Sequence, residues 1–239
     1  MTHDTALVVM AQNFSTIPFY YNKASKSDDP VERLKLIIAN EIACVIYNKS
    51  FEKPLNPILG ETYQARGQDG SFIYLEQVAH HPPTSSFIVD HPNYNFTGIM
   101  EWCIKAGLQS ADVDYIGERT VNFPDGGKIV FNNNRDKIYG LFMGAFGHQR
   151  QGKQEFKDEA NGLTAYVDYG AYMFKKQDYI YGEIKRNNER VCEITGNYVG
   201  YCDFDGVRYW DYREQEEMHF PVEHAADYLP SDARCRTDG

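Results

Sequence analysis

The chain has 239 residues and a net charge of −10, and it is 42% hydrophobic and 14% aromatic. So many aromatic residues can bury enough surface to offset chain entropy, which excludes a disordered protein. The acidic charge repels nucleic-acid phosphates at long range and excludes a general nucleic-acid binder. No apolar run approaches the ~20 residues that cross a bilayer, and the N-terminus shows no secretory signal.

Five cysteines, an odd number without a CxxC pair, are spread over the chain. A chain of this length can bury a sufficient core without disulfide bonds. We therefore expect a reduced, cytoplasmic protein, without a disulfide framework or a zinc ribbon.

Two helices are expected near the N-terminus, the first a short one over residues 6–12. The second begins at Asp29, which can cap it, with Pro30 at the first helical position and Glu32 placed to complete a capping box. Its apolar stripe predicts a helix to about Asn48. The stripe consists of Val31, Leu34, Ile38, Ile42 and Val45.

After Pro57, short segments rich in Ile, Val, Phe, Tyr and Thr alternate with Gly, Asn, Asp and Pro. The predicted strands are Tyr63–Gln64, Phe72–Val78, Thr84–Val89, Phe96–Ile104, Arg119–Phe123, Lys128–Phe131, Tyr139–Phe142, Leu163–Tyr169, Tyr179–Ile184, Val191–Tyr198 and Val207–Trp210. Hairpin-type turns between them predict a mainly β (α+β) chain with an antiparallel sheet that curls or closes.

No repeat or low-complexity linker divides the chain, so we expect a single domain over residues 1–239. Residues 1–18 would form an N-terminal extension and residues 211–239 an acidic C-terminal extension. The latter holds eight acidic residues against three arginines, a net charge of −5. Such a segment is typical of a solvated surface.

The first segment with functional character is EKPLNPILGE, Glu52 to Glu61. Its prolines and glycine fix an irregular backbone directly after the long helix. Lys53 offers a point positive charge, and Asn56, three residues later, offers an amide. The alternative is a turn whose lysine merely points to water.

The second segment is EQVAHHPP, Glu76 to Pro83. Adjacent histidines on a regular strand point to opposite faces, and Pro82 keeps His81 extended, so the rings of His80 and His81 converge only if the backbone bends. A metal site is disfavoured without an HxH or HExxH pattern, and a catalytic site without a nucleophile elbow. Capture of a phosphate by imidazolium groups, or a purely structural pair, remains open.

Together, EKPLNPILGETY and LEQVAHHPPTSSF resemble the oxysterol-binding-protein-related lipid-transfer family. The hallmark of that family is a Glu-Gln-Val-Ser-His-His-Pro-Pro block, and this chain has Ala79 at the serine position. The segments from Asp29 to Leu34 and from Leu229 to Asp238 resemble further family elements. The similarity is expected to span about Phe19 to Asp238.

The resemblance implies a nearly closed antiparallel β-barrel with an N-terminal helix, around a hydrophobic tunnel. The tunnel would hold one lipid, often a sterol, and its mouth would bind the headgroup of phosphatidylinositol 4-phosphate. By position, the residues that would bind this headgroup are Lys53, the backbone of Leu55, Asn56, His80 and His81. The resemblance implies no catalytic residue, no cofactor and no metal.

Glu61 would be a structural residue or a residue of the tunnel mouth. Helical residues that would line the tunnel are Ile38, Ile42, Val45 and Tyr47, although such side chains serve equally well as core. The family's N-terminal lid and its C-terminal helix, which adds a lysine, a glutamate and an arginine to the headgroup site, have no expected counterpart here.

We therefore expect a cytoplasmic lipid-binding and lipid-transfer protein that contacts membrane surfaces transiently and binds no nucleic acid. It would extract and exchange a sterol-like lipid, phosphatidylinositol 4-phosphate or both. One alternative is a phosphoinositide-binding sensor or scaffold without transfer activity. Another is a hydrolase that uses His80 or His81, although no nucleophile and acid accompany them.

Overall fold

The computed structural model describes the main chain of residues 4–47, 54–140, 147–170, 178–217 and 223–224. The side chains of Tyr47, residues 215–217 and residues 223–224 are outside this description. Within the described segments, no helix combines the length and the apolar composition that spanning a bilayer requires.

The N-terminal part holds the helices α1 (Ala6–Gln12), α2 (Ile17–Ser25) and α3 (Pro30–Ala43), and α3 runs into a 3-10 turn, η1 (Cys44–Tyr47). The predicted bounds of α1 are confirmed, whereas α2 was not predicted. Helix α3 is shorter than the prediction, because η1 tightens the chain after Ala43.

Helix α3 begins where the sequence predicted. The Asp29 carboxylate accepts a hydrogen bond from the Val31 N–H at 2.9 Å, as expected of a helix cap. Glu32 was expected to complete a capping box, but its carboxylate accepts a hydrogen bond from the Tyr209 hydroxyl at 2.5 Å. This bond ties the start of α3 to a strand near the other end of the chain.

The described strands form one antiparallel sheet of fifteen strands. They are β1 Thr62–Arg66, β2 Phe72–His80, β3 Pro83–His91, β4 Tyr94–Ala106, β5 Ser110–Ile116, β6 Glu118–Asn122, β7 Lys128–Asn132, β8 Arg135–Tyr139, β9 Gly147–Asp158, β10 Leu163–Tyr169, β11 Tyr179–Arg186, β12 Glu189–Asn197, β13 Tyr201–Phe204, β14 Val207–Asp211 and β15 Glu223–His224. A 3-10 turn, η2 (Tyr212–Glu217), follows β14.

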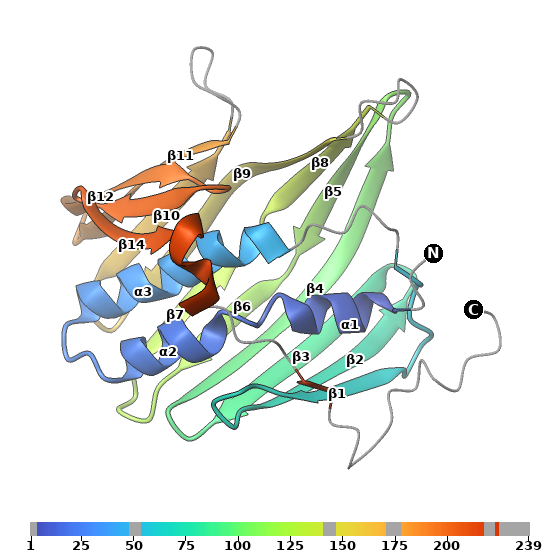
Figure 1. The fold of residues 1–239 in the computed structure, drawn as a ribbon, viewed down its shortest axis with the longest axis horizontal. Coiled ribbons are helices and arrows are strands. Elements are labelled where there is room, and N and C mark those ends of the chain that lie inside the picture. Colours follow the sequence, from blue (N-terminus) through green and yellow to red (C-terminus); the bar gives the residue numbers. More distant parts are fainter. Residues whose placement is uncertain (1–3, 48–53, 141–146, 171–177, 218–222, 225–239) are drawn as a thin grey trace.

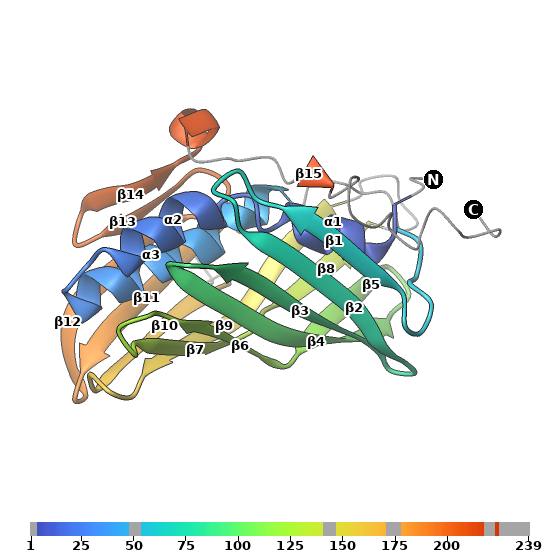
Figure 2. The same ribbon diagram turned by 90° about the horizontal axis from the view of Figure 1, so that it is seen from below.

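Strands β14 and β15 lie at the two ends of the strand order, and neighbouring strands between them are hydrogen-bonded. Figure 1 shows α1, α2 and α3 lying across one face of this sheet, and in Figure 2 the strands curve around the helices. The predicted fold class is confirmed: a mainly β chain whose large antiparallel sheet nearly closes into a barrel.

Buried and exposed residues alternate along the strands, so the buried side chains lie on the concave face and the exposed ones on the convex face. In β2, for example, Ile73 and Leu75 are each 2% exposed, whereas Phe72 and Tyr74 are 37% and 44% exposed. The buried side chains of the strands pack with those of the helices in one hydrophobic core. Leu7 of α1 belongs to this core, so the described part of the N-terminal segment is packed into the domain.

The helical residues expected to line a tunnel lie in the same core. Ile38 and Ile42 are fully buried and Val45 is 6% exposed, so their side chains contact other core residues. The side chain of Tyr47 lies outside the described residues. A tunnel-lining role for these four residues stays a prediction.

Between the long strands β4 and β9 the sheet divides into two pairs of short strands, β6 with β7 and β5 with β8. We call the junction between these two pairs the crease. One half of β4 pairs with β6 and the other half with β5, and the two short strands are joined by Gly117. Gly117 has φ +132°, and a Cβ there would lie 2.2 Å from the Ile99 carbonyl oxygen, so the crease requires glycine. Asn133, between β7 and β8, donates to the carbonyls of Ile99 and Gly117 at 3.4 and 3.1 Å.

Candidate site at the histidine hairpin

The two histidines form the tip of a β-hairpin. Strand β2 ends at His80 and β3 begins at Pro83, with His80 and Pro83 paired and the His81–Pro82 peptide bond in the cis form. The ring centroids of His80 and His81 are 4.8 Å apart, at an interplanar angle of 66°. The bend that the sequence required is therefore present, and the two imidazoles lie together.

A β-bulge just before the tip decides which face His80 occupies. Gln77 pairs with Ser85, but Ala79 pairs with Thr84, so Val78 is an extra residue in β2. In a regular strand His80 would lie on the face opposite to Gln77. The one-residue shift instead places it opposite Pro83, which shares the concave face with Ser85.

The two rings differ in exposure. His80 is half-buried, and its Nδ1 atom is buried without a hydrogen-bond partner among the described residues. His81 is exposed. The pair thus presents one ring to solvent and one ring with unused hydrogen-bonding capacity at the rim of the concave face.

The proline-rich loop is fastened to the same end of β2. The Gly60 N–H donates to the Gln77 carbonyl at 2.8 Å, and the Gln77 N–H donates to the Glu61 carbonyl at 2.9 Å. The Glu61 side chain is 2% exposed and accepts a hydrogen bond from the Ile58 N–H at 3.1 Å, which closes the turn. The loop therefore reaches β2 three residues before His80.

The remaining residues expected to bind the headgroup are placed as follows. The Leu55 N–H donates to the Asp4 carbonyl at 2.9 Å, and the Leu55 carbonyl accepts from the Ala6 N–H at 3.0 Å, so the N-terminal segment occupies its backbone groups. Asn56 is exposed to solvent. Lys53 lies outside the described residues.

An apolar surface continues on the concave face beyond the hairpin. Strand β4 extends past β3 and pairs there with β5, Trp102 opposite Tyr115 and Ile104 opposite Val113. Val113 is 5% exposed, whereas Ile104, on the same face, is 61% exposed. This surface was not predicted from the sequence, although the alternation of Trp102 and Ile104 along β4 was a usable signal.

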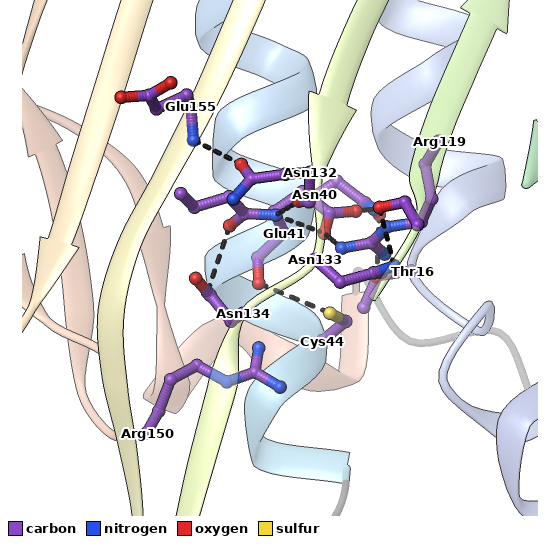
Figure 3. A network of polar contacts seen from close by, with 12 residues as sticks. Thr16, Asn40, Glu41, Cys44, Arg119, Asn132, Asn133, Asn134, Arg150 and Glu155 are labelled. Carbon is purple, nitrogen blue, oxygen red and sulfur yellow. Dashed lines mark hydrogen bonds and ion pairs between the residues drawn. The ribbon is translucent and has the colours of Figure 1, made fainter. Parts of the chain in front are cut away.

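A buried polar cluster between α3 and the sheet, shown in Figure 3, was likewise not predicted from the sequence. The Glu41 carboxylate is 2.6 Å from a guanidinium nitrogen of Arg119 on β6 and accepts from the Gln154 amide of β9 at 3.2 Å. Asn40 accepts from the Thr16 hydroxyl at 2.8 Å. Adjacent polar residues within the apolar sequence of α3 were the available signal.

Burial and neighbouring charges shift the pKa of two groups near the cluster, Cys44 and Asp136. Burial raises the pKa of the Cys44 thiol to about 12, and the nearby Glu41 charge acts in the same direction. Burial also works to raise the pKa of Asp136 on β8. The charge of Arg150 at 3.1 Å and the contact with His148 at 3.3 Å outweigh it and hold this pKa well below its usual range.

Two further observations bear on alternative sites. In the described part of the chain, no three His, Cys, Asp or Glu side chains gather closely enough to hold a metal ion.

A surface pocket of about 520 Å³ lies between α2, α3 and β14, lined by residues such as Phe19, Lys23 and Tyr209. Of the residues singled out for the headgroup, none of those that the structure describes lines this pocket.

Known proteins resemble the chain over almost its whole length. The sequence profile of the oxysterol-binding protein family matches residues 5–238, and thus begins earlier than the expected Phe19. "Oxysterol-binding protein 9" of Dictyostelium discoideum is 29% identical over 257 residues, which cover 92% of this chain and 58% of the relative. Human "Oxysterol-binding protein-related protein 6" is 35% identical over 127 residues, or 52% of this chain and 14% of the relative.

Solved structures share the fold. The Osh1 ORD domain in complex with ergosterol superimposes with a TM-score of 0.77 at 20% identity, covering 84% of this chain and 49% of that one. The Osh3 ORD of Saccharomyces cerevisiae in complex with PI(4)P gives a TM-score of 0.76 at 17% identity, covering 92% of this chain and 62% of that one. The chain thus spans less than two thirds of the length of each of these relatives, and only 14% of human "Oxysterol-binding protein-related protein 6".

The profile match joins the two motif segments, the N-terminal helices and the creased sheet in one continuous alignment. On this evidence, the chain belongs to the oxysterol-binding protein family.

Proposed function

We propose that the chain is a lipid-binding and lipid-transfer module that extracts and exchanges a sterol-like lipid, phosphatidylinositol 4-phosphate or both between membranes. It would do so through transient contact with the membrane surface, in the cytoplasm. Relatives of the same fold were solved with ergosterol and with PI(4)P. The proposal is that the ligands of this chain belong to the same two chemical classes.

The observation that carries the proposal is the paired arrangement of His80 and His81 at the rim of the concave face. Two imidazoles with ring centroids 4.8 Å apart can both donate N–H hydrogen bonds to one phosphate group. Lys53 and Asn56 would add a cation and an amide from the proline-rich loop. In a chain with a net charge of −10, such a site is a local positive exception.

The apolar surface beyond the hairpin supports the lipid part of the proposal. A lipid that buries on the order of 400 Å² of apolar surface gains about 10 kcal/mol on leaving water. Transfer from a bilayer to a protein surface of similar polarity is nearly neutral, so exchange in both directions is thermodynamically feasible. Trp102 and Ile104 lie where such a lipid would continue from the headgroup site.

A non-enzymatic role is consistent with the hairpin. Among the residues that the structure describes, no carboxylate or hydroxyl is hydrogen-bonded to the His80 or His81 ring. Nucleophilic catalysis by the pair would require such partners. The proposal gives the two rings a binding role.

A vesicle assay tests the proposal. Donor vesicles carrying a fluorescent sterol or phosphatidylinositol 4-phosphate are mixed with acceptor vesicles, and lipid movement is followed with the wild-type chain and with His80→Ala/His81→Ala. We expect the wild-type chain to move lipid and the double variant to lose phosphoinositide extraction. Extraction unchanged in the double variant would refute the headgroup assignment.

The same assay separates the alternatives. Binding of phosphoinositide without movement of any lipid would support the sensor or scaffold. Release of a hydrolysed lipid that is lost in the double variant would support the hydrolase.

A further inference from the structure

Gln77 is a polar residue in an apolar position. It follows Ile73 and Leu75 on the concave face of β2 and is 1% exposed. A buried amide costs free energy unless its donors and acceptor find partners. It lies at the bulge, three residues before His80, so its partners bear on the geometry of the hairpin.

The Gln77 side chain bridges the two strands at the bulge. Its carbonyl oxygen accepts a hydrogen bond from the Ser85 hydroxyl at 2.6 Å, and its amide nitrogen donates to the Ala79 carbonyl at 2.8 Å. The extra residue disturbs the ladder here, and the side chain supplies a donor for a backbone carbonyl within the bulge. The glutamine amide offers both a donor and an acceptor, and this position uses both.

The Gln77 backbone holds the other motif. Its N–H and carbonyl groups bond to Glu61 and Gly60 of the proline-rich loop, at 2.9 and 2.8 Å. One residue therefore contacts the loop through its main chain and the hairpin through its side chain. The two motifs meet at this residue.

We propose that Gln77 is a positioning residue for the phosphate site: its amide holds the bulge that turns His80 onto the concave face, beside the proline-rich loop. Gln77 does not itself touch the phosphate. The inference rests on the proposed function, because it assumes that His80 binds a phosphate group.

The test measures binding of a soluble, short-chain phosphatidylinositol 4-phosphate by isothermal titration calorimetry. Gln77→Met keeps the length of the side chain but removes the donor and the acceptor. We expect it to weaken binding about tenfold, as loss of one buried hydrogen-bond pair would. The matched control is Glu76→Gln, the exposed neighbour on the convex face, which should bind within twofold of the wild type.

A double-mutant cycle separates positioning from a general loss of stability. If Gln77 acts through His80, then Gln77→Met/His80→Ala binds no more weakly than His80→Ala alone. Losses that add would overturn the positioning role, and so would unchanged binding by Gln77→Met in the wild-type background. Should Gln77→Met fail to fold, Ser85→Ala, which removes only the hydroxyl partner of the amide, enters the same cycle.

The double-mutant cycle also distinguishes failure of the proposed headgroup site from failure of the positioning role of Gln77. If His80→Ala binds like the wild type, the proposed headgroup site fails and the positioning role fails with it. If His80→Ala weakens binding but Gln77→Met and Ser85→Ala do not, the site stands and only the role of Gln77 is overturned.

Discussion

Arg119 and Glu41 form an ion pair of 2.6 Å that joins the sheet to helix α3 inside the domain. The side chains are 12% and 2% exposed, so both charges are largely removed from water. The Arg119 guanidinium also lies over the Phe131 ring, 4.8 Å from its centroid. Each charge therefore relies on the other to compensate for its removal from water.

Replacing Arg119 by methionine should lower the free energy of unfolding by about 3 kcal/mol, because the Glu41 carboxylate is left buried without its cation. Urea denaturation measures the change. The matched control is Lys105→Met, whose ion pair with Asp114 involves a lysine that is 68% exposed. The control should change stability by about 0.5 kcal/mol or less. Equal effects of the two substitutions would contradict a structural role for the buried pair.

The crease predicts a contrast between two glycines. Gly117→Ala should destabilise the protein by about 3 kcal/mol, because the new Cβ would meet the Ile99 carbonyl and φ is +132°. Gly126 also has a positive φ, but nothing lies within 4 Å of a Cβ there, so Gly126→Ala should cost about 1 kcal/mol. Thermal or urea denaturation of both variants provides the comparison, and a smaller cost at Gly117 than at Gly126 would disprove the close approach.

Asp136 predicts a pH dependence of stability. Its pKa is lowered in the folded protein, so the unfolded chain binds the proton more readily. The stabilisation by its charge is therefore complete above the unfolded pKa of about 4 and is lost as the pH falls towards the lower, folded value. Asp136→Asn should destabilise the protein most at neutral pH, with a difference that shrinks below about pH 4. A difference in melting temperature that stays constant from pH 7 to pH 3 would rule this out.

Cys44 should react slowly with alkylating reagents. With its pKa raised to about 12, its thiolate fraction at pH 8 is on the order of a thousandfold below that of an ordinary cysteine. Mass spectrometry of timed iodoacetamide labelling, read for each cysteine, measures this. We expect slow labelling of Cys44 in the native protein and fast labelling in urea. Equal rates under the two conditions would show that the site does not suppress the thiolate.

Local signals in the sequence predicted part of the fold. Asp29 and Pro30 define the start of α3 with short-range chemistry, and the observed bounds of β10 are those predicted, since polar and apolar residues alternate there. Strands β5, β9, β13 and β15 were not predicted. In β9, the buried positions on the concave face include Arg150 and Gln154, so this face is not recognisable as apolar from the sequence.

The partners of those polar side chains are remote in the chain, which is why the sequence alone could not reveal them. Gln154 bonds to Glu41 across 113 residues. The strand predicted at Tyr139–Phe142 shares only Tyr139 with the observed β8, Arg135–Tyr139, and residues 141–142 lie outside the described part of the chain. In β8, Asp136 is buried against Arg150. In a sequence, a charged residue that is buried beside a partner cannot be distinguished from a charged residue on the surface.

For the candidate site, the sequence located both motifs and the adjacent histidines, but not their geometry. The bulge depends on the register between β2 and β3, which is a property of the pairing. The contact between the proline-rich loop and Gln77 likewise depends on the fold. Lys53 lies outside the described residues, so its place beside the histidines stays a prediction.

The most direct test of the account follows the imidazole nitrogens of His80 and His81 by NMR during titration with soluble ligands. Short-chain phosphatidylinositol 4-phosphate should shift the resonances of both rings, whereas the matched phosphatidylinositol, which lacks the 4-phosphate, should leave them nearly unchanged. Binding of the phosphorylated lipid with both rings unperturbed would contradict the account.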